Sequence, residues 1–424
     1  MDRNAVAARI AAHLDAYAAL WPFQGAVGAS VDGEPLPVRA YGLASVELGV
    51  PNAPGTRFLI WSLTKRFTAA AVLLLEERGA LRTADPLAAW FPDAPGLDRA
   101  ITLAHLLGHA SGLPNYSSDA VFPDSRRTFQ RAHHAPEALL GLFSGLRPDF
   151  APGTAFRYCN TGYWFLGEAI ARASGRPYAE FLQAEVLFPL GLADTGVDDG
   201  RTLVPGAAQG HYLDGGGLVR CGYTDMDLVR ASGGMFSTVA DLLRWERALR
   251  EGRLLRPETV ARMETPGLGG YGLGVFVDRE GGRRRVRHNG GHEGFLAELR
   301  SYPDDGVAAA VLSNTGFANV GGIAHDVAMI AFGEDVAPPQ RPPEHPLSIG
   351  AAEAIVGVYE GGGSRIEVRG AGRGRFEIVL DGTCRLPAYP VRADALHHEW
   401  IDEEYVFEEG ADGRPTLWGL PKRR

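Results

Sequence analysis

A serine and a lysine stand three residues apart, as Ser62 and Lys65, in the stretch FLIWSLTKRFTAAAVLLLEERGAL, residues 58–81. Lys65 and Lys422 are the only lysines among 42 basic residues, so the other forty are arginine. Lysine can lose its proton in a protein if its pKa falls from about 10.4, whereas arginine cannot. The lysine therefore indicates a removable proton, although S-x-x-K alone is also typical of a capping serine followed by a surface lysine.

The apolar run after this motif predicts a helix that begins at or just before Ser62. Ser62 would then lie at the positive end of the helix dipole, with Lys65 one turn later on the same face. A serine hydroxyl is a weak nucleophile and needs a base within hydrogen-bond reach. The spacing thus predicts a nucleophile and its base.

A second candidate motif is Tyr158-Cys159-Asn160, which precedes a predicted helix in FRYCNTGYWFLGEAIARASG. A tyrosine can relay a proton and an asparagine amide can hold a substrate amide. Y-x-N is a weak signal by itself, and an ordinary helix start explains it equally well.

The third motif is His288-Asn289-Gly290-Gly291, at the end of a predicted strand. Glycines there let a substrate backbone lie against the strand edge, and a free amide can face a developing oxyanion. His288 is expected to titrate near pH 6.5. The alternative is a Gly-rich hairpin turn.

The elements that must position these motifs suggest an α/β fold. An amphipathic helix over residues 1–21 is followed by two strands around the turn signal Asp32-Gly33, and then by the helix that contains Lys65. A mostly helical region from about 80 to 250 contains Gly-rich loops such as HYLDGGGLVRCGY. Two hairpins and a helix over 319–332 follow. This order predicts a sheet built from both chain ends, within a catalytic domain of residues 1–335.

Residues 336–350 are rich in proline and predict a stiff linker. Beyond them, residues 351–424 alternate apolar and polar side chains between turns. This pattern predicts a small all-β domain.

In this order, the three motifs resemble those of the penicillin-recognising serine hydrolases, which include class C β-lactamases, D-stereospecific aminopeptidases and related esterases. The segments ITLAHLLGHASGL and ASGGMFSTVADLLRW also look like family segments, so the resemblance covers about residues 5–332. It implies a β-lactamase-like antiparallel sheet flanked by helices, with a helical subdomain that carries the Tyr158 loop.

The resemblance also implies roles for the motif residues. Ser62 would be the acylated nucleophile, and Lys65 and Tyr158 would share the base and acid roles. The backbone N–H groups of Ser62 and Gly291 would form the oxyanion hole. Asn160 and His288 would also belong to the catalytic set, and the substrate would contact Asn160, Gly290 and Gly291. No cofactor and no metal are expected.

One departure concerns substrate choice, because many members carry Lys-Thr-Gly where this chain has His288-Asn289-Gly290. Strong binding of a substrate carboxylate is therefore not expected. The H-x-G version looks more like D-aminopeptidases, esterases and the standalone penicillin-binding-type thioesterases that cyclise nonribosomal peptides. The C-terminal domain resembles the lipocalin-like appendage of those proteins.

The resemblance thus predicts a serine acyl-enzyme hydrolase or acyltransferase for peptidyl (thio)ester or amide donors with a D-configured residue, including donors presented on a carrier protein. Macrocyclisation by aminolysis of the Ser62 acyl-enzyme is one expected outcome. A D-aminopeptidase or amidase, an esterase and a catalytically inactive binding protein remain as alternatives.

Composition excludes other classes of function. The net charge of -9 argues against nucleic-acid binding, and no apolar run approaches the roughly 18 residues of a membrane span. The N-terminal pattern is that of an amphipathic helix and not of a signal peptide, which predicts a cytoplasmic protein. Three scattered cysteines, Cys159, Cys221 and Cys384, argue against a disulfide framework.

Several other motifs favour a structural interpretation. GLGGYG, residues 267–272, leads into a strand and not a helix, which argues against dinucleotide binding. His105 and His109 lack the glutamate of H-E-x-x-H and an evident third ligand. The pairs His133-His134 and His397-His398 and the sequon Asn115-Tyr116-Ser117 are likewise interpreted as structural or incidental.

Overall fold

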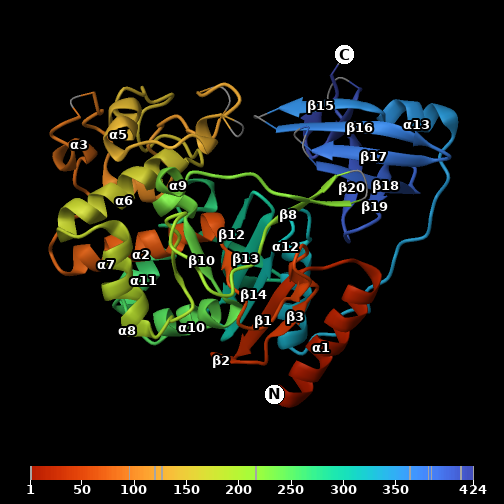
Figure 1. Cartoon of the computed structure of the whole chain (residues 1–424), viewed down its shortest axis with the longest axis horizontal. Helices are drawn as coiled ribbons and strands as arrows, with labels where there is room; N and C mark the ends of the chain where they lie inside the picture. Colours follow the sequence, from red (N-terminus) through yellow and green to blue (C-terminus); the bar gives the residue numbers. More distant parts are fainter. Residues whose placement is uncertain are drawn as a thin grey trace.

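The computed structural model describes residues 2–423 except for positions 95, 119–120, 126–127, 215–216, 362–363, 381, 383 and 411–412. A large α/β body extends from the N-terminus to the end of α12 at Ala331, and a small barrel lies beside it at the C-terminal end (Figure 1). The predicted fold class is confirmed.

The main sheet is antiparallel and joins the two ends of the catalytic body. Its strand order is β11-β12-β13-β14-β1-β2, and β3 also pairs with β1. The central pair, β1 and β14, consists mainly of small or β-branched residues and is fully buried. The strands are β1 (Gly25–Val31), β2 (Glu34–Pro35), β3 (Arg39–Tyr41), β11 (Phe276–Glu280), β12 (Arg283–His292), β13 (Phe295–Tyr302) and β14 (Val307–Ser313).

Helices cover both faces of this sheet. On one face, α1 (Arg3–Leu20) and α12 (Val320–Ala331) bury an apolar stripe against β1 and β14. On the other face lie α2 (Thr64–Glu77) and α10 (Val239–Arg250), which belong to the largest apolar core of the chain. The predicted helices over 1–21 and 319–332 and the turn at Asp32-Gly33 are confirmed.

The segment between α2 and α10 contains the helical subdomain, whose helices lie along the left side of Figure 1. Its helices are α3 (Leu87–Trp90), α4 (Leu103–Leu107), α5 (Pro136–Ser144), α6 (Asn160–Ser174), α7 (Tyr178–Leu182), α8 (Phe188–Leu190) and α9 (Met226–Gly233). Short strands β6 (Phe58–Leu59), β10 (Met235–Ser237) and β7 (Gly196–Val197) form a small sheet under it. A further helix, α11 (Pro257–Met263), follows α10.

One loop prediction was wrong. The segment HYLDGGGLVRCGY forms a hairpin of β8 (His211–Asp214) and β9 (Gly217–Arg220), although its turn lies outside the described residues. The hairpin extends from the catalytic body to the barrel (Figure 1). Leu213 is fully buried in the core cluster of the barrel, so contact with another domain stabilises a strand that its own glycines disfavour.

The C-terminal strands form an antiparallel sheet of eight in sequence order, from β15 to β22. A bridge between Tyr359 and Lys422 brings the first and last strands together, so the sheet is nearly closed. A short helix, α13 (Ile349–Ile355), begins inside the predicted linker and was not expected. The strands are β15 (Gly357–Gly361), β16 (Ser364–Gly372), β17 (Arg375–Leu380), β18 (Cys384–Arg392), β19 (Ala395–His398), β20 (Glu404–Glu409), β21 (Pro415–Leu417) and β22 (Leu420–Pro421).

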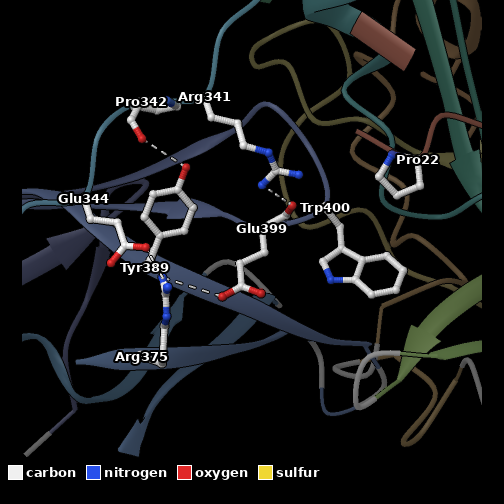
Figure 2. Close-up of a pocket in the computed structure, with 8 residues that line it drawn as sticks. All are labelled: Pro22, Arg341, Pro342, Glu344, Arg375, Tyr389, Glu399 and Trp400. Carbon is white, nitrogen blue, oxygen red and sulfur yellow. Dashed lines mark hydrogen bonds and ion pairs between the residues drawn. The ribbon is translucent and has the colours of Figure 1, made fainter. Parts of the chain in front are cut away.

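The linker lies against the barrel. The Tyr389 hydroxyl donates a hydrogen bond of 3.3 Å to Pro342 O, and the Arg341 guanidinium donates one of 2.8 Å to Glu399 O (Figure 2). These contacts attach the Pro-rich segment to the barrel surface.

Candidate active site

Ser62 and Lys65 lie where a 3-10 turn, η1 (Trp61–Leu63), leads into α2. The Lys65 Nζ is 3.2 Å from Ser62 Oγ, 2.8 Å from Asn160 Oδ1 and 2.7 Å from Ser232 O. The first and second sequence motifs therefore meet at this amine, and an unpredicted residue, Ser232, completes its surroundings.

The electrostatic state of Lys65 follows from these contacts. Its side chain is 0% exposed, and all three hydrogen-bond partners are neutral. Burial without a counter-ion penalises the ammonium form, so the pKa of Lys65 lies well below its usual value. The amine is thus placed to act as a base.

The three contacts also fix the orientation of a neutral Lys65 amine. A neutral amine has two N–H donors and one lone pair, and Ser232 O and Asn160 Oδ1 can only accept. The two donors must therefore face these oxygens, which leaves the lone pair toward the Ser62 hydroxyl. In this state Ser62 O–H donates to Lys65 Nζ, as removal of the serine proton requires.

The backbone just before Ser62 is strained. Trp61 has a φ of 43°, in the left-handed region that a bulky residue rarely adopts. A Cβ added at Gly290 would lie 2.0 Å from Ile60 O, so glycine is required where β12 approaches this turn. The third motif is thus held directly against the Ser62 turn.

The end of β12 has an open edge beside Ser62. Pairing with β11 stops at Arg287, whereas pairing with β13 continues to His292. Gly291 and Ser62 both line a cavity of about 150 Å³. This arrangement fits the predicted oxyanion hole and an extended substrate along the strand edge, roles that remain predictions.

Tyr158 lies beside Lys65, with the Lys65 Nζ 4.8 Å from its ring centroid. Burial raises the pKa of Tyr158, and the nearby Ser62 hydroxyl offsets this only in part. Its buried hydroxyl makes no hydrogen bond of standard geometry to the described residues. The phenol therefore stays protonated and has a proton to give to a bound substrate.

His109 supports the Tyr158 loop. Its Nδ1 accepts a hydrogen bond of 3.1 Å from Cys159 N–H, and its ring contacts that of Tyr158 at a centroid distance of 4.2 Å. Burial holds the pKa of His109 well below its usual range, so the ring is neutral. The structural interpretation of this histidine agrees with these contacts.

Both ends of the Asn160 side-chain amide make hydrogen bonds, one to Lys65 of the first motif and one to Ser117. Its Oδ1 accepts from Lys65, and its Nδ2 donates to Ser117 Oγ at 3.2 Å. Its backbone N–H donates to Asn115 Oδ1 at 3.1 Å. One Nδ2 hydrogen remains for a substrate, so the main structural effect of Asn160 is to orient Lys65.

The sequon Asn115-Tyr116-Ser117, interpreted as incidental from the sequence, is therefore part of the site. Tyr116 hydrogen-bonds through its hydroxyl to Ser232 Oγ at 2.9 Å, which holds the segment that supplies Ser232 O to Lys65. A signal was present, because Asn115 follows the family-like segment ITLAHLLGHASGL by two residues and Ser232 lies within ASGGMFSTVADLLRW.

The expectation that His288 titrates near pH 6.5 is wrong. Its side chain is 0% exposed, and burial lowers its pKa to about 3. Nδ1 donates to Asn289 O at 2.6 Å, so Nε2 accepts from the Tyr271 hydroxyl at 2.9 Å. His288 is therefore a neutral group behind the site and supplies no charge for a substrate carboxylate.

Residues 16–333 match the family model described as Beta-lactamase. The chain belongs to the beta-lactamase family. Within this family, the arrangement of Ser62 and Lys65 is that of a serine hydrolase.

Individual relatives agree with this assignment. Penicillin-binding protein 4* of Bacillus subtilis is 26% identical over 93% of this chain and 92% of its own length. The octameric penicillin-binding protein homologue from Pyrococcus abyssi has the same fold, with a TM-score of 0.69 and 24% identity over 98% of this chain and 95% of that one. A D-stereospecific amidohydrolase from Streptomyces sp. has a TM-score of 0.64 and 26% identity over 75% of this chain and 98% of that one.

A hollow larger than the Ser62 cavity lies elsewhere in this beta-lactamase family member. Its volume is about 680 Å³, and it lies between the linker and the barrel (Figure 2). Its charged side chains pair with one another, since Arg375 contacts both Glu344 and Glu399. The smaller cavity is lined by Ser62 and Gly291, and the buried Lys65 amine lies beside Ser62 Oγ at 3.2 Å.

Two other histidines, His105 and His398, accept hydrogen bonds within the protein. His105 Nδ1 accepts from Thr102 N–H in a helix cap, and His398 Nδ1 accepts from Trp400 N–H. Among the described residues, the one group of three side chains that could hold a metal is His133, Asp225 and Asp227. In the same described ranges, no helix has the length and apolar character needed to cross a bilayer.

Proposed function

We propose that this family member cleaves amide or ester donors through an acyl-enzyme on Ser62, with a D-configured residue on the acyl side of the scissile bond. The observation that carries the proposal is the buried Lys65 amine, 3.2 Å from Ser62 Oγ, with no carboxylate to keep it protonated. The preference for D-residues is supported by the likeness to the D-stereospecific amidohydrolase.

In the acylation step, Lys65 accepts the Ser62 proton as Oγ attacks the donor carbonyl. Ser232 O and Asn160 Oδ1 fix the orientation of the amine throughout. The backbone N–H groups of Ser62 and Gly291 stabilise the oxyanion that forms. Tyr158, which burial keeps protonated, gives its proton to the leaving group.

Loss of the leaving group leaves an ester on Ser62. Tyr158 recovers a proton from Lys65, and the neutral amine can then activate an incoming water by the same geometry. Water attacks the ester, the carboxylic acid leaves, and Ser62 regains its proton. Aminolysis by the peptide's own N-terminus would instead give the predicted macrocycle.

A labelling experiment tests the nucleophile. Incubation with a fluorophosphonate probe should add one adduct, located on Ser62 by mass spectrometry of peptides. Ser62→Ala should abolish the adduct while the thermal unfolding transition is retained. Labelling of another residue would overturn the mechanism.

A donor series tests the substrate class. Peptidyl thioesters and amides that end in a D- or an L-residue are compared by rate and by the ratio of linear acid to cyclic product. We expect faster turnover of D-donors and linear acid in excess. Equal rates for both configurations would refute the D-preference. Cyclic product in excess would show that the acyl acceptor is the amine of the peptide and not water.

A further inference from the structure

A second cavity lies next to the Ser62 cavity and shares Trp61 with it. Its volume is about 360 Å³, more than twice that of the Ser62 cavity at about 150 Å³. Leu59, Met226 and Phe295 contribute apolar surface to its wall. A donor that acylates Ser62 can therefore place an adjoining group in this space.

Asp198 lies in the wall of the second cavity, and its backbone is hydrogen-bonded to the segment that contains Ser232. It directly follows β7, which pairs with β10, and its backbone N–H donates to Gly234 O at 2.8 Å. Gly234 is two residues from Ser232, whose carbonyl holds Lys65. Neighbouring strands are about 4.8 Å apart, so the backbone of Asp198 lies one strand spacing from that of Gly234, two residues beyond the carbonyl that accepts from Lys65.

Three carboxylates line the second cavity, and two of them are already neutralised. Glu47 forms a two-oxygen pair with the Arg220 guanidinium. Glu293 accepts from Gly222 N–H at 2.9 Å and forms an ion pair of 3.4 Å with Arg131.

The third carboxylate, Asp198, has no cationic partner in the described parts of the chain, and Gly200 N–H donates to it at 2.7 Å. Burial raises its pKa, and the neighbouring Asp199 adds to this shift. His211 in the same wall adds no charge near neutral pH, because burial lowers its pKa. The cavity therefore presents an apolar surface with one half-buried carboxylate that lacks a counter-ion.

We propose that this cavity is a specificity subsite for an ammonium group of the acyl donor, with Asp198 as the counter-ion. The inference rests on the proposed function, because the group must belong to a donor that acylates Ser62. Leu59, Met226 and Phe295 would receive the carbon atoms that carry the ammonium. Two sources share this chemistry: the α-amine of an N-terminal residue and the side-chain amine of a lysine-like residue.

Four p-nitroanilide donors separate these sources. Nα-acetyl-D-norleucine carries no cation, D-norleucine carries only the α-ammonium, Nα-acetyl-D-lysine carries only the side-chain ammonium, and D-lysine carries both. We expect kcat/KM to rise by about fivefold or more when the ammonium that reaches Asp198 is added, because fivefold is the upper end for a fully exposed ion pair and Asp198 is half-buried. The singly charged donor that shows the rise identifies the source.

Asp198→Asn tests the counter-ion, because asparagine can still accept from Gly200 N–H but carries no charge. The advantage of the cationic donor over the neutral one should fall to near unity. Asp199→Asn is the matched control: it removes the same charge from the neighbouring residue, which accepts from Arg201 and Thr202 N–H. This control should keep the advantage.

Two results would overturn the subsite: equal kcat/KM for all four donors, or an advantage that Asp198→Asn retains. Fluorophosphonate labelling of Ser62 in the same preparations separates these results from failure of the proposed function. An enzyme that is labelled at Ser62 but is indifferent to the ammonium refutes the subsite alone, whereas loss of Ser62 labelling refutes the acyl-enzyme itself.

Discussion

Two adjacent basic residues of helix α2, Lys65 and Arg66, are equally buried but have opposite electrostatic surroundings. Both are 0% exposed. Arg66 points toward α10 and forms an ion pair with Glu246. Lys65 points toward Ser62, and its three hydrogen-bond partners are all neutral oxygens. Because a buried charge persists only with a partner, the comparison teaches that burial lowers the pKa of Lys65 because no carboxylate among the described residues pairs with it.

The largest effect on activity is expected when Lys65 is replaced by arginine, the residue type of its neighbour Arg66. Lys65→Arg places a permanent cation beside Ser62, and loss of the general base should lower kcat/KM by about 10² or more. The measurement is steady-state turnover of an activated ester or amide, together with the rate of Ser62 labelling.

Lys422→Arg is the matched control, since it changes the other lysine of the chain, which donates to Ala354 O at 2.6 Å. It should leave turnover unchanged. A near wild-type rate for Lys65→Arg would refute proton transfer by Lys65.

The next effect is on stability, and it tests the buried ion pair between Arg66 and Glu246. Arg66→Met leaves Glu246 buried without its main partner, and we expect a loss of about 3 kcal/mol in the free energy of unfolding, measured with urea at pH 7. This is the lower end for a broken buried pair, because Arg250 still lies 4.0 Å from Glu246.

The double variant Arg66→Met/Glu246→Leu removes both charges and should recover most of this stability. If the single and the double variant are equally unstable, packing and not an unpaired charge explains the loss.

The smallest effect on activity is expected when a carboxylate is placed next to Lys65. In Asn160→Asp a negative charge lies beside Lys65 Nζ, at the present 2.8 Å contact, and raises the lysine pKa. Lys65 works as the free base, so the rate of the natural enzyme falls as the pH drops through this pKa. The variant should lose its rate at a higher pH, with about a tenfold lower kcat/KM at pH 7 that recovers as the pH rises.

Asn115→Asp is the control for this prediction. It adds the same charge at a residue that contacts Asn160 N–H and not Lys65. The acid limb of its pH–rate profile should move less than that of Asn160→Asp. Equal shifts would mean that the general field of the site, and not the direct contact, sets the lysine pKa.

Much of the fold could be predicted from the sequence because its signals are local. The apolar spacing of α1 and α12, the Asp32-Gly33 turn and the alternation of the C-terminal strands are set by residues near one another in the chain. The β8–β9 hairpin was missed because its stability depends on a contact between domains, through Leu213 in the barrel core. No local pattern of glycines predicts such a strand.

The sequence by itself determined which residues are able to do the chemistry. Of lysine and arginine, only lysine can lose its proton in a protein, and Lys65 stands one helical turn after Ser62. The order of the three motifs was sufficient to indicate the family, which the match over residues 16–333 confirms.

Only the tertiary structure decided the charge state of these residues. His288 was expected to titrate near neutral pH but is buried against Tyr271, with a pKa of about 3. Asn115, Ser117 and Ser232 join the site from segments far from Lys65 in the chain. A pKa depends on every group that surrounds the side chain and on the water that these groups exclude, and this environment exists only when distant segments pack together.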